Sequence, residues 1–271
     1  MSDTDTLDVN ALVGSHDILF ITLDTLRYDV AQEQMEQGNT PVLQALLPGH
    51  RWELRHSPAS FTYAAHHAFF SGFLPTPAGN PRQPRLFAAR FGGSETTGAG
   101  TCVFDHATLV EGLAARGYHT ACIGGVGFFN RQTPLGSVLP GLFAESHWSP
   151  KLGVAERDST RHQVNLAIDI LAKTPRTQRL LLFINVSAMH QPNYFYLPGA
   201  TEDSRESHGA ALAYVDGQLA PLFQAVAARA PTLCIVCSDH GTAYGEEGQR
   251  GHRLAQRTVW DVPYAEFVIA R

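Results

Sequence analysis

Residues 233–252 read LCIVCSDHGTAYGEEGQRGH, and they decide how the rest of the chain is interpreted. The stretch opens with a continuous apolar run that contains β-branched residues, which is typical of a strand buried on both faces of a parallel sheet. The run ends in Ser238-Asp239-His240-Gly241. Ligands of open α/β sheets bind in the crevice at the carboxyl ends of the strands, which is where this acid and this imidazole would lie.

A carboxylate oxygen beside an imidazole nitrogen suits a divalent transition metal such as Zn²⁺ or Mn²⁺. Taken alone, the pair is also explained by a turn with a capping aspartate and a solvent-facing histidine. Other strand ends favour the metal, because the apolar run at residues 17–23 ends in Asp24 and the run at residues 180–186 is followed by His190. Parallel strands end at one edge of a sheet, so these side chains would converge there. His252, on a glycine-rich loop, can reach back to them.

The composition bounds the class of protein. With 271 residues, 44% hydrophobic and 17% charged, the chain can form one large α/β domain over residues 1–271. Its formal net charge of -5 gives no nucleic-acid-binding signature. The acidic N-terminus lacks the features of a secretory signal, and the apolar runs are too short to span a membrane. We therefore expect a cytoplasmic protein without a membrane partner, and nothing in the sequence indicates an oligomeric state.

The four cysteines do not form a disulfide framework for a chain of this size. Cys234 and Cys237 have C-x-x-C spacing, but both lie inside the predicted strand, where side chains three residues apart point to opposite faces. They cannot share a metal or form a bridge. We interpret them, together with Cys122, as small core residues, whereas Cys102 carries no signal.

Strands and helices alternate along the chain. The patterns predict strands at residues 17–23, 51–56, 118–123, 180–186, 233–237 and 262–270. They predict helices that begin near residues 25 and 40, and helices at residues 63–72, 108–115, 158–173 and 208–229. Residues 124–157 look irregular, and residues 76–101 look like a long loop that faces the substrate. This order predicts an α/β fold with a doubly wound, mainly parallel sheet and helices on both faces.

A hydroxyl and an imidazole occupy the start of the helix predicted at residues 63–72. Thr62 lies at its N-terminus, where backbone N–H groups and the helix dipole favour an anion, and His66 lies one turn along the same face. Contact with a metal would lower the pKa of the Thr62 hydroxyl and make it a nucleophile. His66, His190 and His252 would contact the remaining oxygens of a phosphoryl or sulfuryl group. The alternative is that Thr62 is only the N-cap of the helix.

The other histidines carry weaker signals. His16, His50, His119 and His208 have no partner pattern, and we expect them at the surface. His67 is turned about 100° from His66 on the helix, which places it in the core or at the surface but away from the site.

Five segments occur in the order typical of the sulfatase-like branch of the alkaline phosphatase superfamily, and the chain resembles that branch over roughly residues 17–267. They are DILFITLDTLRYD, SPASFTYAAHHAFFSGFLP, LVEGLAARGYHTACIGG, ALAYVDGQLAPLF and IVCSDHGTAYGEEGQRGH. The resemblance implies an alkaline phosphatase-like fold and a catalytic metal. The metal ligands that it implies are Asp24, Thr62, Asp239 and His240.

The same resemblance implies roles for the remaining candidates. Thr62 matches the nucleophile of the family, and His66 falls where sulfatases place the arginine of their C-x-P-S-R motif. His190 and His252 match positions that bind either substrate oxygens or a second metal.

The chain also departs from the family pattern. Sulfatases need a Cys or Ser that is converted to formylglycine, and Thr62 with its neighbours reads Thr-Tyr-Ala-Ala-His instead, which disfavours a sulfuric ester hydrolase. The frequent second aspartate after the first strand is Thr25 here. The Asp-x-x-x-His pattern of two-zinc phosphodiesterases is missing near His190, so we expect one metal site, with a second as the alternative. The usual C-terminal subdomain is also missing, so substrate choice does not transfer.

These observations predict a metal-dependent hydrolase or transferase, a phosphodiesterase, phosphomonoesterase or phosphotransferase. It would act on a small-molecule phosphate ester, mono- or diester, through a phospho-threonine at Thr62 with Zn²⁺ or Mn²⁺ as cofactor. The alternative is a catalytically degenerate member that binds a phosphorylated or sulfated ligand. A Ser or Cys acyl hydrolase is disfavoured because the chain lacks a G-x-S-x-G elbow.

Overall fold

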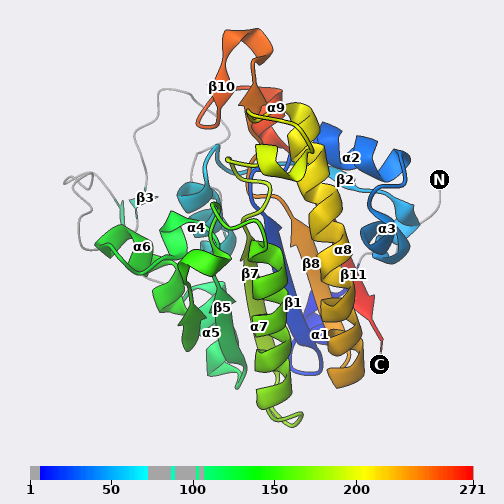
Figure 1. The fold of residues 1–271 in the computed structure, drawn as a ribbon. Coiled ribbons are helices and arrows are strands. Elements are labelled where there is room, and N and C mark those ends of the chain that lie inside the picture. Colours follow the sequence, from blue (N-terminus) through cyan, green and yellow to red (C-terminus); the bar gives the residue numbers. More distant parts are fainter. Residues whose placement is uncertain (1–6, 73–86, 89–101, 104–106, 271) are drawn as a thin grey trace.

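The computed structural model describes residues 7–72, 87–88, 102–103 and 107–270. Within these residues a seven-stranded sheet has the order β2-β11-β8-β1-β7-β5-β6 (Figure 1). The strands are β1 (Asp17–Leu23), β2 (Glu53–His56), β5 (His119–Ile123), β6 (Glu145–His147), β7 (Leu180–Val186), β8 (Thr232–Cys237) and β11 (Asp261–Ile269). β1, β5, β6, β7 and β8 run parallel, whereas β11 is antiparallel to β8 and β2 is antiparallel to β11. The predicted mainly parallel sheet is confirmed.

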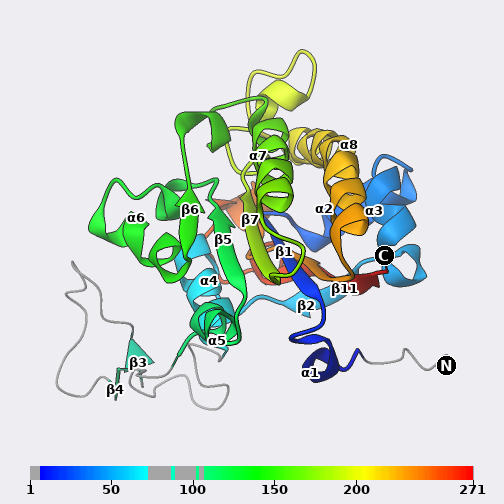
Figure 2. The same ribbon diagram turned by 90° about the horizontal axis from the view of Figure 1, so that it is seen from below.

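Helices cover both faces of this sheet, as the view along the strands shows (Figure 2). One core cluster packs α2, α3, α7 and α8 against the sheet, and a second packs α4 and α5 on the opposite face. The helices are α1 (Val9–Leu12), α2 (Tyr28–Glu36), α3 (Pro41–Leu46), α4 (Thr62–Ser71), α5 (Leu109–Ala115), α6 (Pro134–Val138), α7 (Ser159–Lys173), α8 (Arg205–Arg229) and α9 (Arg257–Trp260). The doubly wound α/β architecture is therefore confirmed.

Shorter elements complete the described chain. They are the strands β3 (Phe87–Ala88), β4 (Cys102–Val103), β9 (Ala243–Tyr244) and β10 (Arg250–Gly251), and the 3₁₀ helices η1 (Pro48–His50), η2 (Gly127–Phe129), η3 (Pro140–Leu142), η4 (Pro150–Leu152), η5 (Tyr194–Tyr196) and η6 (Glu246–Gly248). No helix of the described residues is both long and apolar enough to cross a lipid bilayer.

The central strands are buried because both of their faces are covered. β1 and β7 are buried at every position, and their side chains alternate between the two core clusters. Cys234 belongs to one cluster and Cys237 to the other, so the prediction that they point to opposite faces is confirmed. Cys122 is a buried core residue, as expected.

Two parts of the chain differ from the expected pattern or fall outside it. The stretch at 124–157, expected to be irregular, contains the edge strand β6 and the short helix α6. The sequence did not predict them, because elements of three and five residues are too short to show a hydrophobic period. The long loop expected at 76–101 lies outside the described residues, apart from β3.

An ion pair is buried at the end of the sheet opposite the strand carboxyl ends. Arg229, the last residue of α8, donates from Nε to Asp17 Oδ2 at 2.7 Å, and both side chains are about 95% buried. Asp17 Oδ1 also accepts from the backbone N–H of Leu180. The remaining guanidinium N–H groups donate to the carbonyls of Leu171, Thr174, Pro175 and Gln178. This pair fixes α8 and the loop after α7 to the first residue of β1.

We predict that Asp17→Ala lowers the free energy of unfolding by about 3–5 kcal/mol, because it leaves a buried guanidinium without its carboxylate. Urea denaturation measures the change. Asp261→Ala is the matched control, since Asp261 pairs with the largely exposed Arg257, and it should cost less than about 1 kcal/mol. Equal effects of the two substitutions would show that the buried pair does not anchor the sheet.

Candidate functional site

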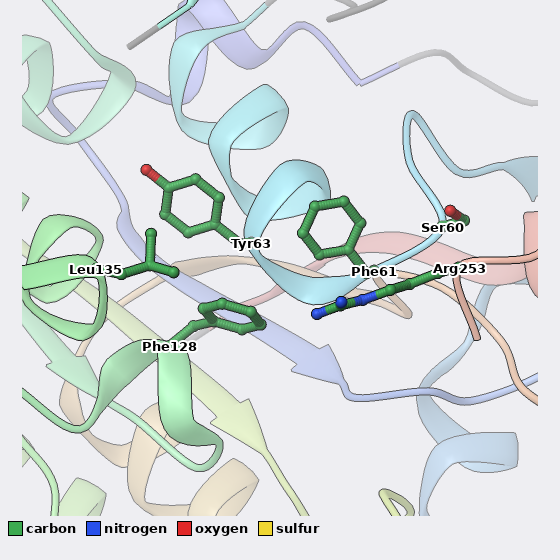
Figure 3. A pocket seen from close by; sticks show the side chains of 6 residues that line it. All are labelled: Ser60, Phe61, Tyr63, Phe128, Leu135 and Arg253. Atoms are coloured by element: carbon green, nitrogen blue, oxygen red, sulfur yellow. The ribbon is translucent and has the colours of Figure 1, made fainter. Parts of the chain in front are cut away.

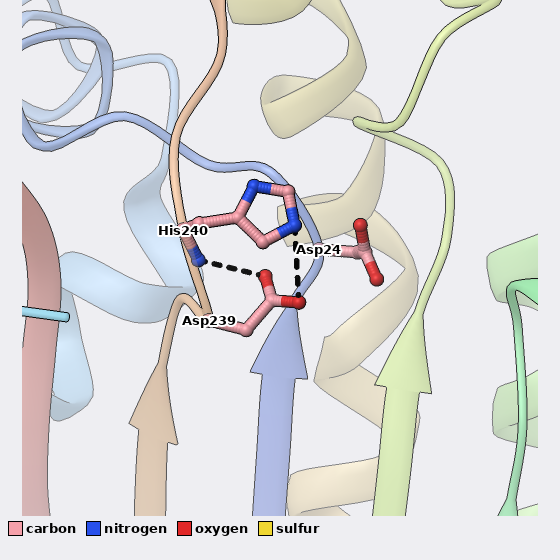
Figure 4. A group of neighbouring side chains, drawn as sticks. All are labelled: Asp24, Asp239 and His240. Carbon is pink, nitrogen blue, oxygen red and sulfur yellow. Dashed lines mark hydrogen bonds and ion pairs between the residues drawn. The ribbon is translucent and has the colours of Figure 1, made fainter. Parts of the chain in front are cut away.

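The residues after three parallel strands meet at one edge of the sheet. In the register of β1 and β8, Thr22 pairs with Cys237. Asp24 and Asp239 each come two residues after this pair, so they lie side by side beyond the two strands. On the other side of β1, the backbone N–H of Asp24 donates to the carbonyl of Val186 at 3.0 Å. Asp24, Asp239 and His240 therefore lie together beyond the ends of these strands, as Figure 4 shows.

These three side chains form a cluster that can hold a metal ion. A carboxylate oxygen from each aspartate and one imidazole nitrogen lie within 4.8 Å of one another, and all three side chains are fully buried. Asp24 Oδ2 accepts from Asn185 Nδ2 at 2.9 Å, and Asp239 Oδ1 accepts from the N–H groups of Thr25 and His240. Among the described residues, Asp24 Oδ1 and Asp239 Oδ2 have no hydrogen-bond partner. Each carboxylate is thus held by one oxygen and presents the other to the cluster.

Burial makes this arrangement costly without a cation. Burial, and next the charge of Asp239, raises the pKa of Asp24 to about 6. Burial likewise raises the pKa of Asp239 to about 7, although hydrogen bonds from backbone N–H groups oppose the shift. A divalent cation between the two carboxylates would remove both penalties.

The tautomer of His240 is fixed by its surroundings. Its Nδ1 lies 2.8 Å from the carbonyl oxygen of Gly241, so Nδ1 carries the proton and donates. Its Nε2 therefore carries a lone pair, and burial lowers the pKa of the ring. This nitrogen lies 3.2 Å from the Thr62 hydroxyl and 3.5 Å from Asp239 Oδ2, so its lone pair faces the cluster.

Thr62 is the first helical residue of α4. The N-cap position is held by Phe61, which makes no side-chain capping bond, so the N-cap alternative for Thr62 is wrong. Gly72 ends the helix in the left-handed conformation, with φ at 75°, as expected. The Thr62 side chain is buried, and its hydroxyl is directed at the lone pair of His240.

His66 does not face the site in the way we expected. Its Nδ1 donates to the backbone carbonyl of Thr62 at 2.7 Å, and its Nε2 lies 2.9 Å from the hydroxyl of Thr22, from which it accepts. Burial lowers the pKa of the ring to about 3, so the imidazole is neutral. Both nitrogens have partners within the protein, and Nδ1 also lies 3.6 Å from Asp239 Oδ2 of the cluster. The structure thus places His66 beneath Thr62 at the edge of the cluster, and its catalytic role stays a prediction.

His190 and His252 lie beside His240. The ring centroids of His240 and His252 are 4.7 Å apart, and those of His190 and His252 are 5.7 Å apart. His190 Nδ1 donates to the carbonyl of Gln191, which leaves its Nε2 as the second polar atom of the ring. Burial, then the nearby His240 and His190, lowers the pKa of His252 to about 4. The structure thus brings both histidines to the cluster, and their roles stay predictions.

Two residues of the site were missed from the sequence. Asn185 holds Asp24, and it also donates to the hydroxyl of Thr22 at 3.3 Å. A polar amide inside the apolar run LLLFINV was the signal that could have found it. Thr25, where the family often has a second aspartate, instead donates its backbone N–H to Asp239 Oδ1 from a left-handed conformation with φ at 64°.

A second polar layer lies behind the cluster. Arg27 forms ion pairs with Asp29 and Glu246, which ties the loop after β1 to the loop after β8. His208, expected at the surface, is fully buried, and its Nδ1 lies 2.7 Å from the hydroxyl of Tyr244. That expectation is wrong because the first turns of α8 pack against β9, where Tyr244 supplies a partner that the sequence pattern did not reveal.

Comparison with solved structures shows the same fold in proteins of low sequence identity. The soluble domain of lipooligosaccharide phosphoethanolamine transferase A from Neisseria meningitidis matches with a TM-score of 0.63 at 14% identity, over 94% of this chain and 76% of that chain. The periplasmic domain of EcEptC from Escherichia coli, solved in complex with Zn, matches with 0.62 at 13%, over 94% and 73%. The putative sulfatase YidJ from Bacteroides fragilis matches with 0.61 at 16%, over 93% and 68%.

Comparison with curated protein sequences gave no match. The family model described as Sulfatase matches residues 16–266, which is most of the chain and includes every side chain of the cluster. The fold is also that of a solved protein of the alkaline phosphatase superfamily, which is 15% identical and has a TM-score of 0.56. The family model covers most of the residues, so the chain belongs to the sulfatase family.

Proposed function

We propose that this protein is a metal-dependent phosphoric ester hydrolase or phosphotransferase in which Thr62 is the nucleophile. The observation that carries the proposal is the position of the Thr62 hydroxyl, 3.2 Å from His240 Nε2. The same cluster contains two buried carboxylates, and each has one oxygen without a hydrogen-bond partner. Thr62 in the place of a formylglycine precursor disfavours a sulfuric ester as the substrate.

The donor set fits a divalent metal. Two carboxylate oxygens, one imidazole nitrogen and one hydroxyl oxygen are ligands that Zn²⁺ accepts, and oxygen-rich sets also suit Mn²⁺. One oxygen of Asp24 and one of Asp239 have no hydrogen-bond partner, so each carboxylate has an oxygen available to such an ion. A structural neighbour of this chain, EcEptC, was solved with Zn, which makes Zn²⁺ the first ion to test.

The chain supplies three functions around that ion. When bound, the metal would lower the pKa of the Thr62 hydroxyl and offset charge on a phosphoryl oxygen. The N-terminus of α4 holds the hydroxyl in place, and the N–H groups of its first turn favour an anion. His190 and His252, whose rings lie beside one another and beside His240, would contact the phosphoryl oxygens. Attack by Thr62 would give a phospho-threonine, which water or an acceptor alcohol then cleaves.

A degenerate member that only binds its ligand is the second candidate. Thr25 favours it, because its side chain is a hydroxyl where the family often has a second carboxylate. Turnover of 4-nitrophenyl phosphate or bis(4-nitrophenyl) phosphate by the zinc-loaded protein decides between the two.

We predict that Thr62→Ala abolishes turnover of these esters and that Thr62→Ser retains a measurable part of it, because only the serine keeps a hydroxyl. Mass spectrometry of acid-quenched protein should locate a phosphate adduct on Thr62 in the wild type. Ser71→Ala is the matched control, since Ser71 lies at the other end of α4, about 13 Å along the axis at 1.5 Å per residue. An adduct on any other residue, or wild-type turnover by Thr62→Ala, contradicts the proposal.

We further predict that Asp239→Asn stabilises the metal-free protein and removes its response to zinc. The pKa of Asp239 is raised in the fold from 3.8 to about 7. In the metal-free protein the free energy of unfolding therefore falls as the pH rises through that range, because the buried carboxyl group must ionise. Asparagine removes this ionisation and keeps an oxygen for the N–H groups of Thr25 and His240. Thermal unfolding at pH 8, with EDTA and then with excess Zn²⁺, measures both effects.

Metal-free Asp239→Asn should melt above the metal-free wild type, and Zn²⁺ should raise the melting temperature of the wild type alone. Asp158→Asn, at a largely exposed position, should respond to zinc like the wild type. Equal stabilisation of Asp239→Asn and the wild type by Zn²⁺ would place the metal elsewhere.

A further inference from the structure

A pocket lies at the start of α4, next to the proposed nucleophile, and is bordered by partly buried residues of α4 and η2 (Figure 3). Its volume is about 360 Å³, within the range of small-molecule sites. The residues that line it are Ser60, Phe61, Tyr63, Phe128, Leu135 and Arg253. Phe61 and Tyr63 are the sequence neighbours of Thr62, so two walls of the pocket flank the nucleophile.

Three aromatic rings make the pocket flat-sided and apolar. The ring of Phe128 lies 6.4 Å from that of Phe61 and 5.6 Å from that of Tyr63, and Leu135 on α6 closes the opposite side. Phe128 belongs to η2, whose next residue, Phe129, is buried in the core 5.2 Å from the ring of His66. The wall formed by Phe128 is therefore fixed relative to α4 rather than carried by a free loop.

A single cation stands at the rim of this apolar pocket. Arg253 directly follows His252, and its backbone N–H donates to the carbonyl of Ser60 at 2.8 Å. Its guanidinium lies 5.0 Å from the centre of the Phe61 ring. Among the described residues it has no carboxylate partner. Arg253 thus lines the aromatic pocket and is the next residue after His252, whose ring centroid lies 4.7 Å from that of His240 in the cluster.

The position of the pocket determines which part of a substrate it can hold. In an in-line phosphoryl transfer the leaving oxygen lies opposite the attacking hydroxyl. A pocket walled by the two neighbours of Thr62 lies beside that hydroxyl, not opposite it. An organic group bound there is therefore the one that stays on phosphorus.

We propose that this pocket holds an aromatic or similarly flat, apolar substituent that is retained on phosphorus, so that the substrate is a phosphate diester with one such group. Arg253 contacts a negatively charged phosphoryl oxygen at the rim. The inference rests on the proposed function, because Thr62 sets the position of the phosphorus atom. It adds a substrate class and two specificity-determining residues, Phe128 and Arg253.

Two chromogenic esters with one leaving group test this proposal on the zinc-loaded protein. 4-Nitrophenyl phenylphosphonate and 4-nitrophenyl methylphosphonate differ only in the group retained on phosphorus. In each, the Thr62 Oγ–P bond forms, the P–O bond breaks, and 4-nitrophenolate leaves with the electron pair while the Thr62 proton passes to solvent. Water then cleaves the Oγ–P bond and releases the phosphonate.

We expect kcat/KM to be at least about tenfold higher for the phenyl ester, with most of the difference in KM. Phe128→Ala and Phe128→Leu should remove this preference by lowering kcat/KM for the phenyl ester, and a melting temperature close to that of the wild type shows that each variant folds. Arg253→Gln should lower kcat/KM for both esters by about tenfold or more. Leu109→Ala and Arg161→Gln, exposed positions on α5 and α7, are the matched controls.

Each contrary result has a distinct meaning. Equal kcat/KM for the two esters overturns the pocket assignment and leaves the proposed function standing. Turnover of 4-nitrophenyl phosphate without turnover of either phosphonate ester shows a monoesterase and also overturns the diester inference. Wild-type rates in Arg253→Gln overturn the role of the guanidinium. Failure of all three esters and of bis(4-nitrophenyl) phosphate removes the proposed function, and the inference with it.

Discussion

The structure depends on two carboxylates that are buried side by side. Asp24 and Asp239 lie at the same level on neighbouring strands, with no exposed surface, and burial raises the pKa of each. Such a pair is unfavourable in a protein interior unless a cation or protons balance its charge. The surrounding chain is arranged to keep the pair in place, since Asn185, the Thr25 N–H and the His240 N–H each hold one oxygen and leave the other oxygens turned inward.

The support beneath this cluster is both polar and aromatic. Asn185, Thr22 and His66 form a hydrogen-bonded chain that ends on the backbone carbonyl of Thr62. The rings of Phe69, Phe70, Phe129 and Phe183 surround His66. The first turn of α4 is thereby fixed to the ends of β1 and β7, so the Thr62 hydroxyl is held against His240 without help from a substrate. His66 thus holds the backbone of Thr62 in place.

The sequence predicted the elements that carry strong periodicity or strong chemistry. The continuous apolar runs of β1, β7 and β8 indicated buried parallel strands, and polar residues at their ends indicated the cluster. The role of His66 was not predictable in this way, because a histidine one turn after the nucleophile has the same spacing whether it faces a ligand or the core. His208 was misplaced because its partner, the Tyr244 hydroxyl, comes from a strand 36 residues later, and only the fold brings the two together. Arg253 and Phe128 lie far apart in sequence, and only the fold brings them together.

The central claim is that a divalent metal lies between the two buried carboxylates. Anomalous X-ray diffraction at the zinc edge, from crystals grown with stoichiometric Zn²⁺, locates the ion directly. The account predicts one dominant peak in contact with Asp24, Asp239, His240 Nε2 and the hydroxyl of Thr62. A dominant peak at another position, or zinc-replete crystals with no peak between Asp24 and Asp239, would contradict it.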